Sequence, residues 1–553
     1  MIYPKIPLAQ SIIEICLAKG IKNIVISPGS RNAPLTIGFV SNPGFNCYSI
    51  ADERCAAFFA LGIAKQLQKP VAVVCTSGSA LLNYYPAFSE AFYSQIPLIV
   101  ISADRPQSKI DIGDGQTIRQ ENVFKNHSLF NANLTEAVSF ENDLKINKSI
   151  NKAIFEKGPV HINAPFEEPL YETVSNLEVT VSVVEVPEKK NKFTITKTNE
   201  FISIWNNSKK KLIVVGENRP YEIDAEIIDW LANDKSVVVM TETTSNLHHP
   251  TFINNIDTII TPFTEEEFAN FKPDLLITFG GMVVSKRIKS FLRKHQPTHH
   301  WHIDELRAYD TYGCLTKHFK TNPNQFFNTF LYLVSPIQSS YFKDFEEINN
   351  LRKIKTETYL AKIPFCDFKA FEIIIPALPQ NSILHLSNSS PIRYAQLIDI
   401  ESSISVFCNR GTSGIDGSTS TAIGAAVSTD KQSVLIAGDI GFLYDSNGLW
   451  NNYIPKNFKI ILINNGGGGI FRILPGHEEN QVFNTFFETS HCLTAEHLAK
   501  MYGFDYSIAS DESSLKEKML ELFSKNEKPA ILEVFTPTRV NDKILLQYFK
   551  ELN

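Results

Sequence analysis

Gly438-Asp439-Ile440-Gly441-Phe442 and Asn464-Asn465-Gly466-Gly467-Gly468-Gly469 are the two segments that best indicate the architecture of this chain. Each follows an apolar run that predicts a β-strand, at 433–437 and at 460–463. In a parallel α/β sheet both strand ends open at the same edge, where ligands bind. Asp439 offers a carboxylate, Asn465 an amide oxygen and the glycine run an accessible carbonyl, a hard-oxygen set suited to Mg²⁺. We therefore predict a Mg²⁺ site here, completed by a diphosphate and water.

Each half of this signal also has an ordinary structural interpretation. Asp439 could cap a helix, and Asn465-Gly466 could form a turn. The four successive glycines could be a flexible loop, although they also allow backbone to approach phosphate closely. Asp439 and Asn465 lie 26 residues apart, each at a predicted strand end. This combination favours the metal–diphosphate interpretation.

The bulk composition is that of an ordinary globular protein. At 553 residues the chain is long enough for about three or four domains. A formal net charge of −6 argues against a general nucleic-acid surface, but not against local basic pockets for anionic substrates. The eight cysteines include no CxxC pair, so we expect a reduced, cytoplasmic protein without a disulfide framework or a zinc site. No apolar run approaches the roughly 18 residues of a membrane helix, and the charged N-terminal segment favours an amphipathic helix over a signal peptide.

Strand and helix signals alternate along the chain and predict an α/β fold of three doubly wound parallel-sheet domains. The expected domains are 1–180, 195–335 and 365–553, separated by a polar linker at 185–195 and a charged connector at 336–370. The first and third are similar in size and pattern, which indicates a duplicated architecture. The middle domain has no GxGxxG motif and therefore no predicted dinucleotide site. Strands are predicted at 21–26, 70–75 and 97–102 in the first domain and at 211–215, 236–240, 258–260, 274–279 and 300–303 in the middle one.

Four arginines follow predicted strands or lie in loops near Gly or Pro, namely Arg31, Arg105, Arg393 and Arg410. A lone loop arginine is usually solvated, but the planar guanidinium matches carboxylates, and four at strand ends indicate a polyanionic substrate. Glu53 stands at a predicted helix start, where a glutamate is most often a partner of the helix dipole. The run His299-His300-Trp301-His302 matches no metal-ligand spacing, so a surface strand is favoured there.

Further motifs carry a resemblance to a known family. Gly438-Asp439-Ile440, followed by Asn465, resembles the GD(G)…NN signature of thiamine-diphosphate (ThDP) enzymes. The resemblance narrows to the branch of that family that serves menaquinone biosynthesis. It rests on Ile26-Ser27-Pro28-Gly29-Ser30-Arg31-Asn32-Ala33-Pro34-Leu35, Asp52-Glu53-Arg54, Thr76-Ser77-Gly78-Ser79-Ala80, Ser102-Ala103-Asp104-Arg105-Pro106, Gly158-Pro159-Val160-His161-Ile162-Asn163, Asn409-Arg410-Gly411-Thr412-Ser413-Gly414-Ile415-Asp416-Gly417 and Gly467-Gly468-Gly469-Ile470-Phe471. These motifs cover the first and third domains well and the middle domain weakly.

The resemblance implies a pyrimidine-binding first domain, a central domain and a diphosphate-binding third domain. It also implies a homodimer or a dimer of dimers, with ThDP held between the first domain of one subunit and the third domain of the other. Glu53 is expected to act as the catalytic residue by hydrogen-bonding N1′ of the aminopyrimidine. Asp439, Asn465 and Gly467 are the implied ligands of Mg²⁺ or Mn²⁺. The other implied cofactor-binding residues are Ser389, Ile415, Gly438, Ile440 and Gly441.

The implied activity is that of a transferase: ThDP-dependent decarboxylation of 2-oxoglutarate and 1,4-addition of the resulting carbanion to isochorismate, with release of CO₂. Ser389, Gln116 and Arg393 are expected to hold the part derived from 2-oxoglutarate. Ser30, Arg31, Arg105, Lys286 and Arg287 are expected to receive isochorismate, with Arg410 near both substrates. Ile470, Phe471 and Leu474 are expected to form an apolar wall that excludes water.

Two alternatives stay open from the sequence. The first is another ThDP-dependent 2-oxoacid decarboxylase or a relative of acetolactate synthase, against which the arginine set argues, because pyruvate carries one carboxylate. The second is a non-catalytic ThDP-binding homologue, against which the joint presence of Glu53, Asp439 and Asn465 argues.

Overall fold

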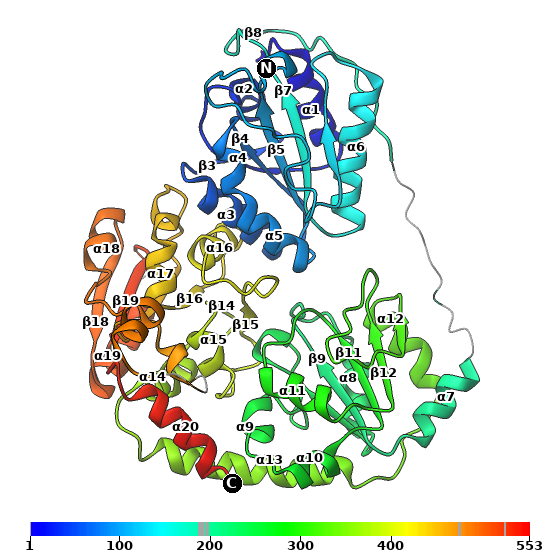
Figure 1. Cartoon of the computed structure of the whole chain (residues 1–553), viewed down its shortest axis with the longest axis vertical. Coiled ribbons are helices and arrows are strands. Elements are labelled where there is room, and N and C mark those ends of the chain that lie inside the picture. The colour runs from blue at the N-terminus through cyan, green and yellow to red at the C-terminus, as the bar shows by residue number, and fades with distance from the viewer. Residues whose placement is uncertain (1, 186–192, 194–197, 474–475, 477, 525–526) are drawn as a thin grey trace.

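The computed structural model describes residues 2–185, 193, 198–473, 476, 478–524 and 527–553. Three parallel α/β sheets with covering helices form the three units of the molecule (Figure 1), and the predicted fold class is confirmed. Most of the predicted linker at 185–195 lies outside the described residues. Among the helices of the described ranges, none is both long enough and apolar enough to cross a membrane.

The first unit contains a six-stranded parallel sheet in the order β3-β2-β4-β5-β7-β6. Its strands are β2 (Asn23–Ile26), β3 (Asn46–Ser49), β4 (Val71–Cys75), β5 (Leu98–Asp104), β6 (Asn131–Asn133) and β7 (Val160–Pro165). Its helices are α1 (Pro7–Ala18), α2 (Ala33–Ser41), α3 (Glu53–Leu67), α4 (Ser79–Asn83), α5 (Tyr85–Tyr93) and α6 (Phe140–Phe155). A short antiparallel pair, β1 (Tyr3–Pro4) with β8 (Thr173–Val174), lies outside this sheet.

The third unit repeats that topology, with six strands in the order β15-β14-β16-β17-β19-β18. Its strands are β14 (Ile383–Leu386), β15 (Ser405–Phe407), β16 (Ser433–Gly438), β17 (Phe458–Asn464), β18 (Asp505–Ala509) and β19 (Ala530–Phe535). Its helices are α14 (Asp367–Ile374), α15 (Ser390–Ala395), α16 (Ser418–Ala426), α17 (Asp439–Tyr444), α18 (Glu496–Tyr502), α19 (Glu512–Ser524) and α20 (Asn541–Glu551). In chain order both sheets run 2-1-3-4-6-5, so the predicted duplication is confirmed.

The middle unit has a five-stranded parallel sheet in the order β10-β9-β11-β12-β13. Its strands are β9 (Lys211–Val215), β10 (Val237–Met240), β11 (Leu275–Phe279), β12 (His299–Ile303) and β13 (Lys317–Phe319). Its helices are α7 (Thr198–Asn207), α8 (Ala225–Asn233), α9 (Ile256–Ile260), α10 (Glu265–Phe271), α11 (Lys286–Lys294) and α12 (Pro323–Phe330), and α13 (Tyr341–Leu360) leads to the third unit.

One predicted strand of the middle unit is wrong, because 258–260 belongs to the helix α9. The β-branched residues of this segment suit a strand when taken alone. However, Ile256, Ile259 and Ile260 are buried together, and their i, i+3, i+4 spacing is that of one helix face. The surrounding core, which includes Ile288 and Phe345, selects the helix.

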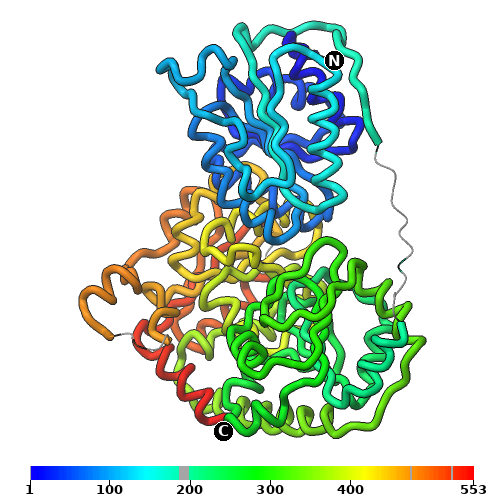
Figure 2. The backbone as a smooth tube through the Cα atoms, turned by 45° about the vertical axis from the view of Figure 1, so that its right-hand side comes forward, coloured from blue at the N-terminus to red at the C-terminus, as the bar shows by residue number. Residues whose placement is uncertain are grey.

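The first and third units are joined by close packing of α3 on α16. Figures 1 and 2 both show the first unit (blue) lying against the yellow part of the third. A Cβ built at Gly62 would lie 2.1 Å from the carbonyl oxygen of Thr421, and one at Gly424 would lie 2.0 Å from the carbonyl oxygen of Phe59. The small-residue face of α3 therefore allows backbone-to-backbone contact, and one apolar core runs through both units.

We predict that Gly62→Ala lowers the free energy of unfolding by about 1–3 kcal/mol, because its methyl group meets backbone atoms that cannot turn away. Gly115→Ala is the matched control, since a Cβ at Gly115 has no neighbour within 4 Å. Denaturant titration followed by circular dichroism measures both variants. Equal unfolding midpoints for the two variants would contradict the packing argument.

Candidate active site

Two loops of the third unit meet at the point where its strand order reverses. In the order β15-β14-β16 this point lies between β14 and β16, and such a crevice is where open α/β sheets bind ligands. Ser389, whose φ is +76°, follows β14, while β16 ends at Gly438 and is followed directly by Asp439, the first residue of α17. A Cβ at Gly438 would lie 3.8 Å from Pro391 of α15, so the two strand ends are neighbours.

Asp439 holds the glycine run in place. Its Oδ2 accepts hydrogen bonds from the backbone N–H groups of Gly466 and Gly467, both at 2.9 Å, and its Oδ1 accepts one from Ile440 at 2.7 Å. Burial raises the pKa of Asp439, while these N–H groups and nearby His491 act in the opposite direction. The structure therefore brings together the carboxylate and the glycine loop from which the metal site was predicted.

Asn465 presents an unsatisfied oxygen in this crevice. Its Nδ2 donates to Oδ2 of Asp367 at 2.9 Å, while its Oδ1 is buried and has no hydrogen-bond partner. Gly467 has a φ of +154° and accepts a hydrogen bond from the N–H of Gly469 at 3.0 Å. Because an unpaired buried carbonyl oxygen is costly without a partner, the site suits a bound cation. The residues at this site therefore fit the predicted Mg²⁺.

Asp367 is a neighbour of this site that the sequence did not reveal. Its carboxylate is 2 % exposed, and burial raises its pKa to about 6, with the charge of Asp439 adding to the shift. Hydrogen bonds from Thr536 and Asn465 oppose the shift. Asp367 lies 98 residues before Asn465, so only the folded arrangement shows the contact.

Beyond the glycine run the chain forms a short 3₁₀ turn (Gly469–Ile473) that contains Ile470 and Phe471. Ile470 is half-buried, and Phe471 is 36 % exposed and lies 6.2 Å from the ring of Phe487. Arg472 anchors this turn through a paired contact with Glu488, at 2.5 and 2.6 Å. Leu474, the third residue of the predicted apolar wall, lies outside the described residues.

The loop that carries Arg410 and Ile415 is fixed by contacts from the first unit and from within the third unit. Buried Glu90 of α5 accepts hydrogen bonds from the backbone N–H groups of Gly411 at 2.7 Å and Thr412 at 2.6 Å. The Oδ1 of Asn388 accepts a hydrogen bond from Arg410 at 2.6 Å. Ile415 lies beside Gly441, since a Cβ there would be 3.5 Å from the Ile415 carbonyl oxygen.

Glu53 begins α3, as predicted, and is half-buried. Asp52 caps the helix and also accepts a hydrogen bond from Asn447 at 2.9 Å. Arg54 donates to the carbonyl oxygen of Tyr444, the last residue of α17, also at 2.9 Å. The residues on both sides of Glu53 are thus tied to the third unit of the same chain, near the helix that Asp439 begins.

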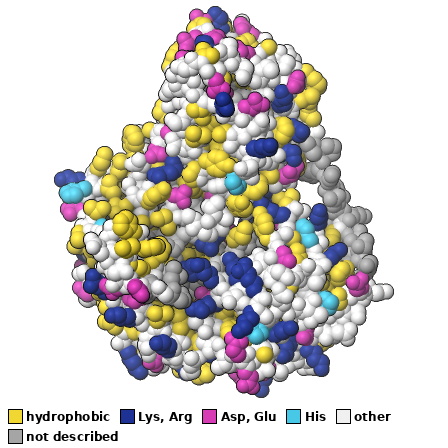
Figure 3. Space-filling view, in the orientation of Figure 1, with side chains coloured by type: hydrophobic (Ala, Val, Ile, Leu, Met, Phe, Trp, Pro, Cys, Tyr) yellow, Lys and Arg dark blue, Asp and Glu magenta, His cyan; other side chains and the backbone are white. Residues whose placement is uncertain are grey.

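Positive charge gathers where the third unit meets the middle unit, and Figure 3 shows Lys and Arg side chains in the hollow of this face. Burial lowers the pKa of Arg393, with the charge of Arg410 adding to the effect. Burial also lowers the pKa of Lys289, with Arg410 and Lys286 contributing. Burial raises the pKa of half-buried Asp257, and the charges of Arg393 and Arg287 act in the opposite direction. The structure therefore groups four predicted substrate residues, Lys286, Arg287, Arg393 and Arg410, and adds Lys289, which the sequence did not single out.

Arg31 and Arg105 form a separate pair in the first unit. Arg31 is buried and donates to Glu168 at 3.0 Å, and Arg105 lies 3.8 Å from the same carboxylate. Ser30, next to Arg31 in the chain, is exposed, and so is Gln116, which has a φ of +53°. The backbone of Gln116 adjoins Gly78, whose Cβ would lie 3.2 Å from the Gln116 carbonyl oxygen. Glu168 was not predicted, because it lies 137 residues from Arg31.

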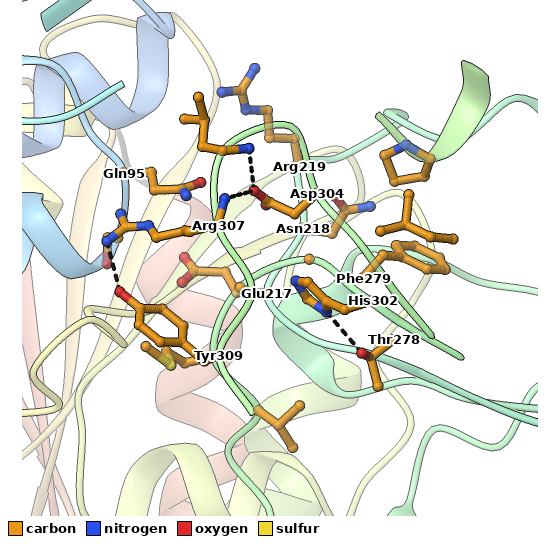
Figure 4. Close-up of a pocket in the computed structure, with 18 of the residues that line it drawn as sticks. Gln95, Glu217, Asn218, Arg219, Thr278, Phe279, His302, Asp304, Arg307 and Tyr309 are labelled. Atoms are coloured by element: carbon orange, nitrogen blue, oxygen red, sulfur yellow. Dashed lines mark hydrogen bonds between the residues drawn. The ribbon is translucent and has the colours of Figure 1, made fainter. Parts of the chain in front are cut away.

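A second cavity lies at the carboxyl edge of the middle sheet, with a volume of about 240 Å³. Figure 4 shows residues of two segments that line it, Glu217, Asn218 and Arg219 from one and His302, Asp304 and Arg307 from the other. His302 Nδ1 and Thr278 Oγ1 are 2.8 Å apart, and Arg307 donates to Tyr309 at 2.7 Å. None of the predicted site residues that the structure describes lines this cavity.

Comparison with protein families defines the class of protein. Residues 6–128 match the model described as the N-terminal TPP-binding domain of thiamine pyrophosphate enzymes, where TPP is another name for ThDP. Residues 185–355 match the middle domain of these enzymes, and residues 389–534 match their C-terminal TPP-binding domain. The chain is thus a three-domain thiamine pyrophosphate enzyme, in agreement with its three parallel sheets.

Similar curated proteins narrow the class. The chain is 69% identical over 553 residues to the 2-succinyl-5-enolpyruvyl-6-hydroxy-3-cyclohexene-1-carboxylate (SEPHCHC) synthase of Flavobacterium johnsoniae, with 100% of each chain covered. Proteins of the same name from Christiangramia forsetii and Bacteroides thetaiotaomicron are 51% and 39% identical, with 99% and 97% of each chain covered. The chain belongs to the SEPHCHC synthase family.

We predict that Glu488→Ala destabilises the segment after the glycine run by about 3–5 kcal/mol, because it leaves the buried charge of Arg472 without its main partner. Glu479→Ala is the matched control: Glu479 contacts the same arginine at 3.3 Å, but its side chain is 46% exposed, so we expect a loss of at most about 1 kcal/mol. Hydrogen exchange of peptides covering 466–490 reports both effects. Equal protection in the two variants would contradict this prediction.

Proposed function

We propose that this protein is the transferase that decarboxylates 2-oxoglutarate and adds the resulting unit to isochorismate, forming SEPHCHC and CO₂ in menaquinone biosynthesis. The observation that carries the proposal is the cationic cluster of Arg393, Arg410, Arg287 and Lys289, which extends from the loops around the Asp439 site. Both substrates are carboxylates, and guanidinium groups bind carboxylates with two parallel hydrogen bonds. Full-length identity to proteins named for this reaction supports the proposal.

The chain's own residues would hold the cofactor in the crevice between β14 and β16. Asp439, Asn465 and Gly467 would bind Mg²⁺ or Mn²⁺, and Ser389, Gly438, Ile440 and Gly441 would face the diphosphate. When bound, ThDP supplies the electron sink for decarboxylation. Ile415, next to Gly441, would support the cofactor from its apolar side. The half-buried Glu53 carboxylate would hydrogen-bond N1′ of the aminopyrimidine.

Substrate binding would use both cationic regions. In this proposal Arg393, with Ser389 and Gln116, holds 2-oxoglutarate. Isochorismate contacts Ser30, Arg31, Arg105, Lys286 and Arg287, and Arg410 reaches both substrates. Ile470 and Phe471 exclude water from the reacting atoms.

The proposal includes a homodimer or dimer of dimers in the cytoplasm. Large apolar side chains support the assembly, because they are exposed on the elements around the site: Tyr444 is 52 % and Trp450 56 % exposed, and Phe486 is 76 % exposed. Exposed apolar groups of this size commonly mark protein interfaces. A subunit interface there would cover the end of α17, the helix that begins with Asp439.

An assay of CO₂ release tests the function. The purified protein with ThDP and Mg²⁺ is given 2-oxoglutarate or pyruvate, each with and without isochorismate, and the new product is followed by mass spectrometry. We expect product only with 2-oxoglutarate and isochorismate together. Turnover of pyruvate instead would favour another ThDP-dependent decarboxylase, and no CO₂ from either acid would favour a non-catalytic ThDP-binding protein.

We predict that Glu53→Gln lowers kcat by about 10²–10⁴-fold, because an amide cannot take up or release the proton. The Kd for ThDP, measured by calorimetry, should change little, since the diphosphate site is untouched. Asp52→Asn is the neighbouring control, because asparagine also caps helices well, and it should keep its activity. Full activity of Glu53→Gln would exclude the proton role.

We predict that Arg393→Ala raises the KM for 2-oxoglutarate by about 10–100-fold, the equivalent of losing one charge-assisted contact of about 1.5–3 kcal/mol. The KM for isochorismate should stay within about twofold. Arg539→Ala, whose side chain is 70% exposed, controls for removal of positive charge. An unchanged KM for 2-oxoglutarate in steady-state kinetics would remove the assignment.

A further inference from the structure

Asp367 bridges the ends of two neighbouring strands. β17 and β19 run parallel with Asn464 opposite Phe535, so the next residues, Asn465 and Thr536, lie side by side at the sheet edge. Asp367 Oδ2 accepts the hydrogen bond from Asn465 Nδ2 at 2.9 Å, and its Oδ1 accepts one from the hydroxyl of Thr536. Each oxygen of the Asp367 carboxylate therefore accepts a hydrogen bond from the residue that follows one of the two strands.

The Asp367 backbone is fixed as firmly as its side chain. Asp367 is the first residue of α14, and its N–H donates to Oδ1 of Asn541, the first residue of α20, at 2.8 Å. Asn541 in turn donates to the carbonyl oxygen of Pro537 at 2.9 Å. Both helix starts are thus tied to the segment that follows β19. These hydrogen bonds fix the position of the Asp367 carboxylate.

This contact settles which way the Asn465 amide faces. An ionised carboxylate only accepts hydrogen bonds, so Asn465 must turn its NH₂ group toward Asp367. Its Oδ1 then points away from Asp367 and is the buried oxygen that has no partner. With the reverse orientation, two acceptors would face each other across 2.9 Å. Asp367 therefore excludes the orientation in which Asn465 offers a donor to the crevice.

We propose that Asp367 is a positioning residue for the metal, which turns the Asn465 amide so that its oxygen, and not its nitrogen, is offered to a divalent cation. This inference deepens the proposed function and rests on its Mg²⁺–ThDP site. Carboxylates behind a ligand commonly fix its orientation, and their loss typically weakens metal binding by 10–100-fold. Asp367 contacts neither substrate nor cofactor in this role, because it acts through Asn465.

The test compares Asp367→Asn with the wild-type protein. An amide at 367 can present either its oxygen or its NH₂ group, so the Asn465 amide is free to turn over. Calorimetric titration of ThDP at graded Mg²⁺ concentrations should show an apparent Kd for Mg²⁺ about 10–100-fold weaker. Saturating Mg²⁺ should restore the wild-type affinity for ThDP, a rescue that a merely structural defect would not show.

Asp445→Asn is the matched control. Asp445 is likewise fully buried, its pKa is likewise raised to about 6 by burial, and it bonds Ser420 away from the crevice. We expect this variant to keep the wild-type Kd for Mg²⁺, and an equal weakening in both variants would overturn the proposal.

Thr536→Val is a second variant, which tests the positioning role of Asp367 if Asp367→Asn does not fold. It removes one donor to Asp367 and should weaken Mg²⁺ binding by a few-fold. Wild-type Mg²⁺ affinity in folded Asp367→Asn would overturn the role of Asp367, and if that variant does not fold, wild-type Mg²⁺ affinity in Thr536→Val would overturn it. If ThDP binding to the wild-type protein does not depend on Mg²⁺, the proposed metal site itself fails, and this is evident before any substitution is made.

Discussion

The contact of α3 with α16 is the constraint on which the arrangement of the units depends. Glycines at 62 and 424 bring the two backbones together, so the start of α3 has a fixed place beside α17. At the other end of α3, buried Lys65 donates to the carbonyl oxygen of Cys408 at 2.6 Å and pairs with Glu217 of the middle unit at 2.5 Å. One helix thus sets the positions of Glu53, the third unit and the middle unit together.

Buried carboxylates fix the positions of the loops around the crevice. Asp439 holds the glycine run, Glu90 holds the loop before Ile415, and Asp367 holds two strand ends. Each is buried, and a buried charge is costly unless hydrogen bonds satisfy it. The loops around the crevice supply those donors through their backbone N–H groups and side chains, so the geometry of the loops and the ionisation of the carboxylates depend on each other.

The features that could be predicted from the sequence depend on residues that lie close together in the chain. The strand ends, the helix start at Glu53 and the duplicated sheets follow from periodicity and turn residues, and Asp439 meets Gly467 as expected. Asp367, Glu90, Glu168 and Lys289 could not be found in this way, because their partners are distant in sequence or on another element. The error at 258–260 has a related cause: β-branched residues suit a strand locally, but the core around α9 selects a helix.

The distribution of charge follows from the same arrangement. Asp439 is close enough to Asp367 for its charge to add to the effect of burial and disfavour ionisation of Asp367, and two neighbouring carboxyl groups are an environment that suits a divalent cation. The positive charge of Arg410 disfavours the charged form of Arg393 on α15, and a carboxylate ligand would relieve this repulsion. Two adjoining regions of opposite sign therefore suit the proposed metal and an acidic substrate. This complementarity, rather than any single residue, is why the crevice suits a cation-bound cofactor beside a polycarboxylate.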